Sequence, residues 1–443
     1  MKDLIRSAVQ LQGLSRYEIE KSWELYYPTT KPKSITVHQL RSEGWEGDKL
    51  TVKTTELTGQ YVPFKDQLLQ LLNNQDVWNH VMKSFERNCQ NLTNVSDSDD
   101  RIYKDVWDGD IVRRNPVYVK NRGNVLGIQI WHDDVELANA MGSRSGLRGK
   151  MTVLFWTLMN LPPHLRSSPK SINLLGMIES KLFKEHKPIQ FLKPFIDELK
   201  AFENGVHLQT KHGSRTWNAI ILNIVGDIPA QNLLSGFKIS VANAMKPSRI
   251  CEISRLQLVT IHRDPDCFLR QNDSYQQQLE QILNEKDLKK KEALSKEYGI
   301  VEESCFSQLP YVDVTVYFNH DLMHIAYEGV LNTESCLVLH VLLRDGVIPA
   351  IETINKEIKK IKTTSNVFDS LPDLRLQDVL KKNKLKFSAS EMKNVCAVLP
   401  VVLDQHVSFM ENEYYCNFLL LLEITASLQC YKFNMKTYAS SPI

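Results

Sequence analysis

The sequence, 443 residues long, has no long apolar run, no Cys-x-x-Cys pair and no repeat at a fixed spacing. A helix needs about 20 mainly apolar residues to cross a bilayer, and the best run, 418–422, stops at Glu423. The first residues also lack the basic and then apolar pattern of a secretory signal. The absence of repeats argues against solenoids and propellers. These features predict an intracellular protein that has no membrane partner.

Charge and cysteine content narrow the class further. The formal net charge is only +2, so any binding of nucleic acid would have to rely on local basic patches. The eight cysteines are scattered along the chain, which is typical of reduced thiols rather than of a disulfide framework. With 42% hydrophobic and 24% charged residues, the composition is that of an ordinary globular protein with one to three domains.

The order of the apolar patterns predicts an α/β fold. Alternating and β-branched runs predict strands, and apolar residues at helical spacing predict helices. The resulting order, β-β-β-α-β, then an interruption, then β-α, is the plan of an RNase H-like core, a mixed five-stranded sheet with flanking helices. The predicted strands are 125–132, 150–159, 172–178, 217–225 and 312–318, and the main predicted helices are 189–202 and 321–343.

We divide the chain into four predicted parts. Residues 1–60 form an N-terminal accessory segment with one helix at 15–27, and 61–120 form a helical lead-in. The RNase H-like core covers 121–345 and contains a polar helical insertion at about 252–310. A basic linker and a helical C-terminal region, with two helices separated near Pro400 and the polar stretch 411–413, cover 346–443.

Three acidic residues fall where such a core carries its chemistry. Asp133 follows the first predicted strand, Asp227 follows the fourth, and Glu328 lies on the late helix. Phosphodiester cleavage and strand transfer use two divalent metals about 3.5–4 Å apart, and Mg²⁺ prefers carboxylate oxygens and water as ligands. The trio therefore suits a two-metal nuclease.

A structural interpretation stands beside the catalytic one. Asp133 and Asp134 fit a turn after a strand, and Asp227, two residues before Pro229, fits a helix start whose carboxylate caps backbone amides. Glu328 fits a solvated helix position. The residues alone leave both interpretations open.

Several short motifs follow one another in a set order. They are Trp131-His-Asp-Asp-Val-Glu136 with Met141-Gly-Ser-Arg144, Asn160-Leu-Pro-Pro163, the run 191–200 with Asn204-Gly-Val206, Gly226-Asp-Ile-Pro-Ala230, Ser235-Gly-Phe237, and Asp321-Leu-Met-His324 with Glu328-Gly-Val330. Together they resemble the transposases of CACTA (En/Spm-type) DNA elements, in particular the animal branch. The resemblance extends from about residue 61 to 435.

This resemblance implies a DDE-type nuclease and strand transferase that uses Mg²⁺ or Mn²⁺. Asp133, Asp227 and Glu328 would be the metal ligands and catalytic carboxylates, with Asp134 as the competitor for the first position. His324 would bond a ligand or the scissile phosphate, and the alternative is a buried, satisfied histidine. DNA would be the partner, the location nuclear, and a homo-oligomer is expected because transposases commonly act as oligomers.

Basic residues near the predicted core are candidates for contact with DNA phosphates. The candidates are Arg113, Arg114, Arg144, Arg148 and Lys150.

The chain also departs from the family, which usually carries a Cys-x-x-Cys after the Gly-Phe motif. Here that position reads Ser248-Arg-Ile-Cys251, so one thiol is missing, which argues against a zinc knuckle. This loss favours a truncated element copy or a host-adopted sequence. The second interpretation is therefore a domesticated, catalytically inactive nuclear factor that binds DNA or protein.

Overall fold

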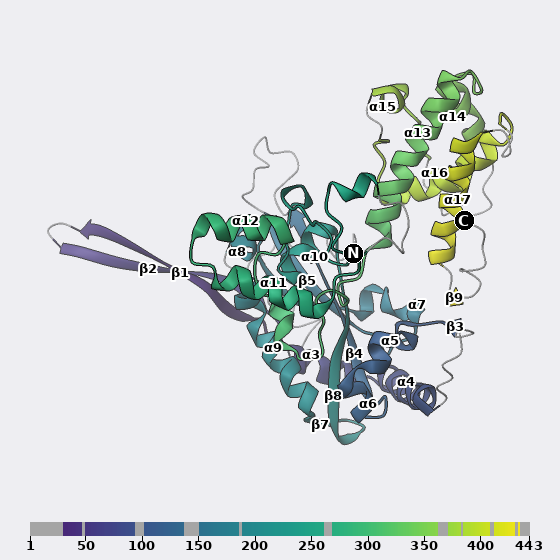
Figure 1. The fold of residues 1–443 in the computed structure, drawn as a ribbon. Coiled ribbons are helices and arrows are strands. Elements are labelled where there is room, and N and C mark those ends of the chain that lie inside the picture. The colour runs from purple at the N-terminus through teal and green to yellow at the C-terminus, as the bar shows by residue number, and fades with distance from the viewer. Residues whose placement is uncertain are drawn as a thin grey trace. The chain divides into compact units, whose positions relative to one another are not determined.

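The structure is a computed structural model, and it describes residues 30–46, 49–93, 102–136, 150–185, 188–260, 268–361, 371–381, 384–407, 412–429 and 433–434. The chain divides into two compact units (Figure 1). The first unit comprises Met1–Ser96 and Asp105–Asn319, and the second comprises Asp97–Lys104 and His320–Ile443. The predicted helix at 15–27 lies outside the described residues.

A mixed seven-stranded sheet forms the centre of the first unit. The strand order is β1-β2-β6-β5-β4-β8-β7, in which β4 and β8 are parallel and the other neighbours are antiparallel. The predicted α/β class is confirmed, but the sheet has more than the five strands expected. The strands are β1 Lys33–Glu46, β2 Lys49–Tyr61, β4 Val125–Glu136, β5 Lys150–Leu158, β6 Ile172–Glu179, β7 Val206–Thr210 and β8 Gly213–Val225.

Two of the extra strands come from the segment predicted to be accessory. Strands β1 and β2 form the long hairpin drawn in purple in Figure 1. The end of β2 joins the sheet, since Gln60 pairs with Met177 and Tyr61 pairs with Gly176 of β6. The third extra strand, β7, is a short hairpin partner of β8. Its five residues were too few to give a periodic signal.

The strand predicted at 312–318 is wrong. Within it, Asp313 directs a turn, because its carboxylate accepts hydrogen bonds from the backbone and hydroxyl of Thr315 and its carbonyl accepts from Val316 and Tyr317. Only Phe318 pairs with the sheet, through an isolated parallel bridge to Ile224. The alternating apolar pattern arises because Val312 and Val314 are buried in the turn.

Helices pack around the sheet of the first unit. Phe64 of α3 contacts Trp156 of β5, and Phe195 and Phe202 of α9, edge to face at ring distances of 4.8–5.5 Å. The helix predicted at 189–202 is confirmed as α9, and further helices lie in the segments predicted to be a helical lead-in and a helical insertion. The helices of this unit are α3 Phe64–Leu72, α4 Gln75–Thr93, α5 Asp110–Arg114, α6 Pro116–Lys120, α7 Pro163–Arg166, α8 Ser180–Glu185, α9 Pro188–Asn204, α10 Ile228–Ser235, α11 Asn272–Asn284 and α12 Leu288–Tyr298, with the 3₁₀ turn η2 at Val106–Asp108.

The second unit is helical with its own apolar core. Its late helix begins as a π-helix, η8, and continues as α13, in agreement with the predicted helix at 321–343. The two predicted C-terminal helices are confirmed as α16, which ends at Leu403, and α17, which begins at Glu413. The separation therefore follows Pro400, which lies inside α16. The elements are β3 Ile102–Tyr103, η8 Met323–Val330, α13 Leu331–Arg344, α14 Ile351–Lys360, α15 Leu376–Lys381, α16 Ala389–Leu403, α17 Glu413–Leu428 and β9 Phe433–Asn434. Among the described residues of the whole chain, no helix is long and apolar enough to span a membrane.

Candidate functional site

The two consecutive aspartates of the first motif lie within β4. Pairing with β5 continues past them to Glu136, which is opposite Lys150, so the expectation that Asp133 follows the strand is wrong. Because successive side chains of a strand point to opposite faces of the sheet, Asp133 and Asp134 face opposite ways. Their surroundings therefore differ.

Asp134 is held by three donors. Its Oδ1 accepts hydrogen bonds from Thr152 Oγ1 at 2.6 Å and Ser180 Oγ at 3.0 Å, and its Oδ2 lies 2.6 Å from Lys184 Nζ. Burial opposes the charge on Asp134, but these hydrogen bonds and the Lys184 charge outweigh it and lower the pKa. Asp134 therefore ties β4 to β5 and α8.

Asp227 begins α10. Its Oδ1 accepts a hydrogen bond from the backbone N–H of Ala230 at 2.7 Å, so the structural interpretation, a helix cap, is confirmed. A half-buried carboxylate at a helix N-terminus is stabilised by the exposed amides of the first turn.

The parallel pairing of β4 and β8 brings Asp133 and Asp227 to the same end of the sheet. The last ladder pair is Trp131 with Val225, and each aspartate stands two residues beyond its member of that pair. The negative charge of Asp227 acts on Asp133, whose pKa is raised first by loss of water around the carboxyl and then by Asp227 and Asp134, against the opposing hydrogen bond of the Asp134 amide.

Among the described residues, no lysine or arginine side chain pairs with either of these two carboxylates, Asp133 and Asp227. A neighbouring negative charge disfavours the ionised form of a carboxylate, and a bound cation favours it. Carboxylate oxygens are also ligands that hard divalent ions such as Mg²⁺ take, together with several waters.

A buried histidine lies beside the pair. His132 is 6% exposed, its Nε2 lies 3.1 Å from the carbonyl oxygen of Ala230, and burial lowers the pKa of its ring. The sequence patterns did not single out this residue, whose signal in the sequence is its place directly before Asp133.

The other two predicted catalytic residues belong to the second unit. His324 and Glu328 lie on η8, and both are partly exposed. His324 Nδ1 lies 2.7 Å from Oδ2 of Asp321, whose Oδ1 accepts from the backbone N–H of Met323. His324 is thus neither fully buried nor without a partner. Asp321 was missed, although its spacing of three residues from His324 on a predicted helix is a signal for such a pair.

The candidate DNA-contacting residues have different outcomes. Arg144 and Arg148 lie outside the described residues. Lys150 is exposed at the start of β5, and Arg114 is exposed at the end of α5. Arg113 is half-buried, with its Nε enclosed. Lys150 and Arg114 are exposed cations of the kind that contact DNA phosphates. Their role in DNA binding stays a prediction.

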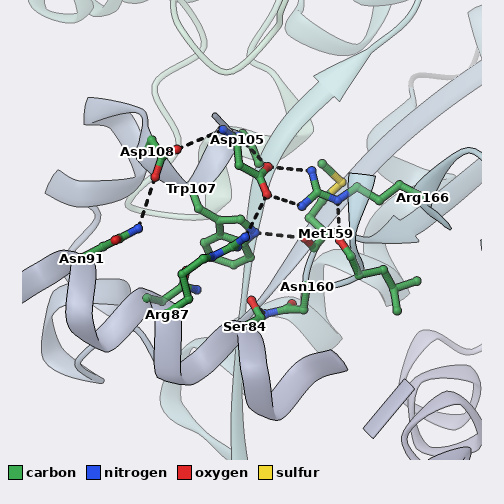
Figure 2. A network of polar contacts seen from close by, with 12 residues as sticks. Ser84, Arg87, Asn91, Asp105, Trp107, Asp108, Met159, Asn160 and Arg166 are labelled. Atoms are coloured by element: carbon green, nitrogen blue, oxygen red, sulfur yellow. Dashed lines mark hydrogen bonds and ion pairs between the residues drawn. The ribbon is translucent and has the colours of Figure 1, made fainter. Parts of the chain in front are cut away.

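The Asn160-Leu-Pro-Pro163 motif has a structural role. Asn160 is buried, its Oδ1 accepts from Gly127 N at 2.8 Å, and its Nδ2 donates to Val125 O at 3.1 Å and Ser84 Oγ at 3.2 Å. One amide thus joins β4, the turn after β5 and α4. Figure 2 shows this side chain beside the Trp107 ring.

A second part of the same network surrounds η2. Arg166 makes two parallel 2.6 Å hydrogen bonds to Asp105, and Arg87 approaches the same carboxylate at 3.4 Å (Figure 2). Trp107 Nε1 donates to Met159 O at 3.0 Å. Such bidentate pairs fix geometry as well as charge. This network orients η2 against the end of β5 and carries no free reactive group.

Glu198, in the motif at 191–200, also acts structurally. Its Oε2 accepts a hydrogen bond from the backbone N–H of Lys65 at 2.6 Å, which satisfies a free amide in the first turn of α3. Burial raises the pKa of Glu198, although that hydrogen bond opposes the shift.

Gly236 of the Gly-Phe motif ends α10 in the left-handed conformation, at φ 77°. A Cβ at this position would clash with the carbonyl oxygen of Glu302.

The described residues include no group of three or more His, Cys, Asp or Glu side chains that could hold a metal ion. Within them, Cys251 is a free thiol. No protein-family profile matches the chain, and no curated protein matches its sequence.

Proposed function

We propose that this chain is a transposase-derived protein in which Asp133 and Asp227 bind Mg²⁺ or Mn²⁺ for the cleavage and joining of DNA strands. The observation that carries the proposal is the carboxylate pair at equivalent positions beyond the last ladder pair of two parallel strands, with which no basic side chain of the described residues forms an ion pair. Like charges disfavour each other's ionised form, and a bound cation relieves that cost.

We further propose that part of the sheet is an RNase H-like core. The segment β6-β5-β4-β8 supports this assignment, because β6, β5 and β4 follow one another antiparallel and β8 returns parallel to β4. The connection from β6 to β8 contains α9, as a parallel crossover requires. On this proposal the β1–β2 hairpin and β7 are additions to that core.

Bound divalent ions would activate an attacking oxygen and stabilise the leaving oxygen of a phosphodiester. Asp133 and Asp227 would hold them, and the resemblance adds Glu328 as the third ligand and His324 as a contact to the phosphate. Lys150, Arg113, Arg114, Arg144 and Arg148 would contact the DNA backbone. We propose a nuclear location because the substrate is DNA. We propose a homo-oligomer because transposases commonly act as oligomers.

Binding of Mn²⁺ to the full chain, followed by electron paramagnetic resonance, tests the metal site. We expect Asp133→Asn and Asp227→Asn each to weaken binding about tenfold or more, because each removes a ligand charge. Asp134→Asn should retain binding, because Asp134 faces the other side of the sheet and is already paired. Asp197→Asn, which alters an exposed carboxylate on α9, is the matched control.

A plasmid-nicking assay with Mg²⁺ or Mn²⁺ tests the reaction. We expect nicking by the wild-type chain and its loss in Asp227→Asn and Glu328→Gln, with Asp197→Asn unchanged. Activity that survives both substitutions would contradict the assignment of the carboxylates. A salt-sensitive shift of DNA without cleavage would favour the alternative, a domesticated DNA-binding factor that has lost catalysis.

A further inference from the structure

Two hydrogen bonds that meet at one residue connect His132 with the first turn of α10. The His132 Nε2 lies 3.1 Å from Ala230 O, and Ala230 N donates to Asp227 Oδ1 at 2.7 Å. Because a carbonyl oxygen only accepts, Nε2 carries the proton and donates it. The backbone of Ala230 is therefore held at its carbonyl by His132 and at its amide by Asp227.

Packing fixes the imidazole in this position. His132 is 6% exposed, and the ring of Phe183 from α8 stands edge-on to it at 5.7 Å. The first turn of α10 also comes close to the preceding chain, since a Cβ added at Gly226 would lie 3.2 Å from the Cβ of Ala230. The strand that carries Asp133 and the helix that begins at Asp227 are thus held at one separation.

The second nitrogen of the ring, Nδ1, is buried and has no hydrogen-bond partner in the described part of the chain. Among the described residues, the bond from Nε2 to Ala230 O is therefore the hydrogen bond that holds the ring.

We propose that His132 is a positioning residue, which sets the separation of Asp133 and Asp227 and thereby the affinity of the pair for a divalent cation. The affinity part rests on the proposed function. The link from His132 through Ala230 to Asp227 is a property of the fold and can be measured separately.

The test compares two substitutions of similar length in the full chain. His132→Gln keeps an N–H that can reach Ala230 O, whereas His132→Met fills similar space without a donor. We expect Met to weaken Mn²⁺ binding by about tenfold or more, the range seen when a group that orients a metal ligand is removed, and Gln to stay within about threefold of wild type. Thermal melts confirm that both variants are folded.

Hydrogen–deuterium exchange of the peptide covering α10 supplies the second measurement. We expect faster exchange of the Ala230 amide in His132→Met and recovery in His132→Gln, with unchanged exchange in α9. If wild type binds no Mn²⁺, the proposed function fails, and the exchange pattern still decides the positioning role. Equal exchange and equal Mn²⁺ affinity in Met and wild type, or equal losses in Met and Gln, would overturn the inference.

Discussion

The role of each carboxylate in this protein is determined by the donors around it. Asp134 has three donors and a pKa below the ordinary value, whereas Asp133, its neighbour in β4, has a pKa above it. Glu198 lies in partly buried surroundings and accepts a backbone amide. Residues of one type therefore serve as a structural link, a candidate ligand and a helix cap.

The raised pKa of Glu198 predicts how stability changes with pH. The folded state holds the proton more tightly than the unfolded state, so the free energy of unfolding should fall as pH rises from the ordinary range of a glutamate through the raised pKa. Glu198→Gln, which keeps an oxygen acceptor for Lys65 N, should remove this fall. Urea unfolding between pH 4 and about 7 measures it.

Asp197→Asn is the control for this measurement, because Asp197 is exposed on the same helix and pairs with Lys193 on the surface. Its pH profile should follow that of wild type. A Glu198→Gln profile that still falls with pH to the same extent would show that another group is responsible.

At the scale of elements, buried polar side chains decide how strands and helices are joined. Asn160 bonds to β4 and α4, Asp105 and Arg166 join η2 to α7, and Asp227 caps α10. Asn160 and Asp227 also pair backbone groups at the ends of these elements that would otherwise stay unsatisfied.

The strongest junction to test is Asn160. Asn160→Ala removes the acceptor for Gly127 N and the donor to Val125 O and leaves both backbone groups unpaired and buried. We expect a loss of about 2–4 kcal/mol in the free energy of unfolding, measured by urea titration. Asn79→Ala, at an exposed position of α4, should change it by no more than about 0.5 kcal/mol; equal effects would contradict the assigned role.

At the scale of the whole molecule, the described residues form two separate hydrophobic cores. One surrounds the sheet and includes Leu126, and the other lies among the C-terminal helices and includes Leu399. A unit with its own core can unfold as its own cooperative transition. The domain division thus has a consequence that calorimetry can detect.

We expect two thermal transitions in the full chain. Leu399→Ala should lower one midpoint and Leu126→Ala the other, because each creates a cavity worth about 2–5 kcal/mol in a different core. Differential scanning calorimetry of the two variants, and of the double variant, checks this. A single transition that both substitutions lower equally would show that the units unfold together.

The sequence by itself determined the local elements and the α/β class. The period of apolar residues depends only on neighbours along the chain, so β4, β5, β6, α9, β8 and the late helix were found close to their observed bounds. The capping role of Asp227 was also among the two interpretations that the sequence allowed. The carboxylate roles and the DNA contacts stay predictions from resemblance.

Only the tertiary structure decided the strand neighbours and the partners of each side chain. Pairing of β2 with β6, the turn at Asp313 and the unbroken helix at Pro400 depend on contacts between distant residues or on buried surroundings, which periodicity does not record. The same holds for the difference between Asp133 and Asp134. Adjacent residues of one chemical type differ here because the sheet gives each a different face.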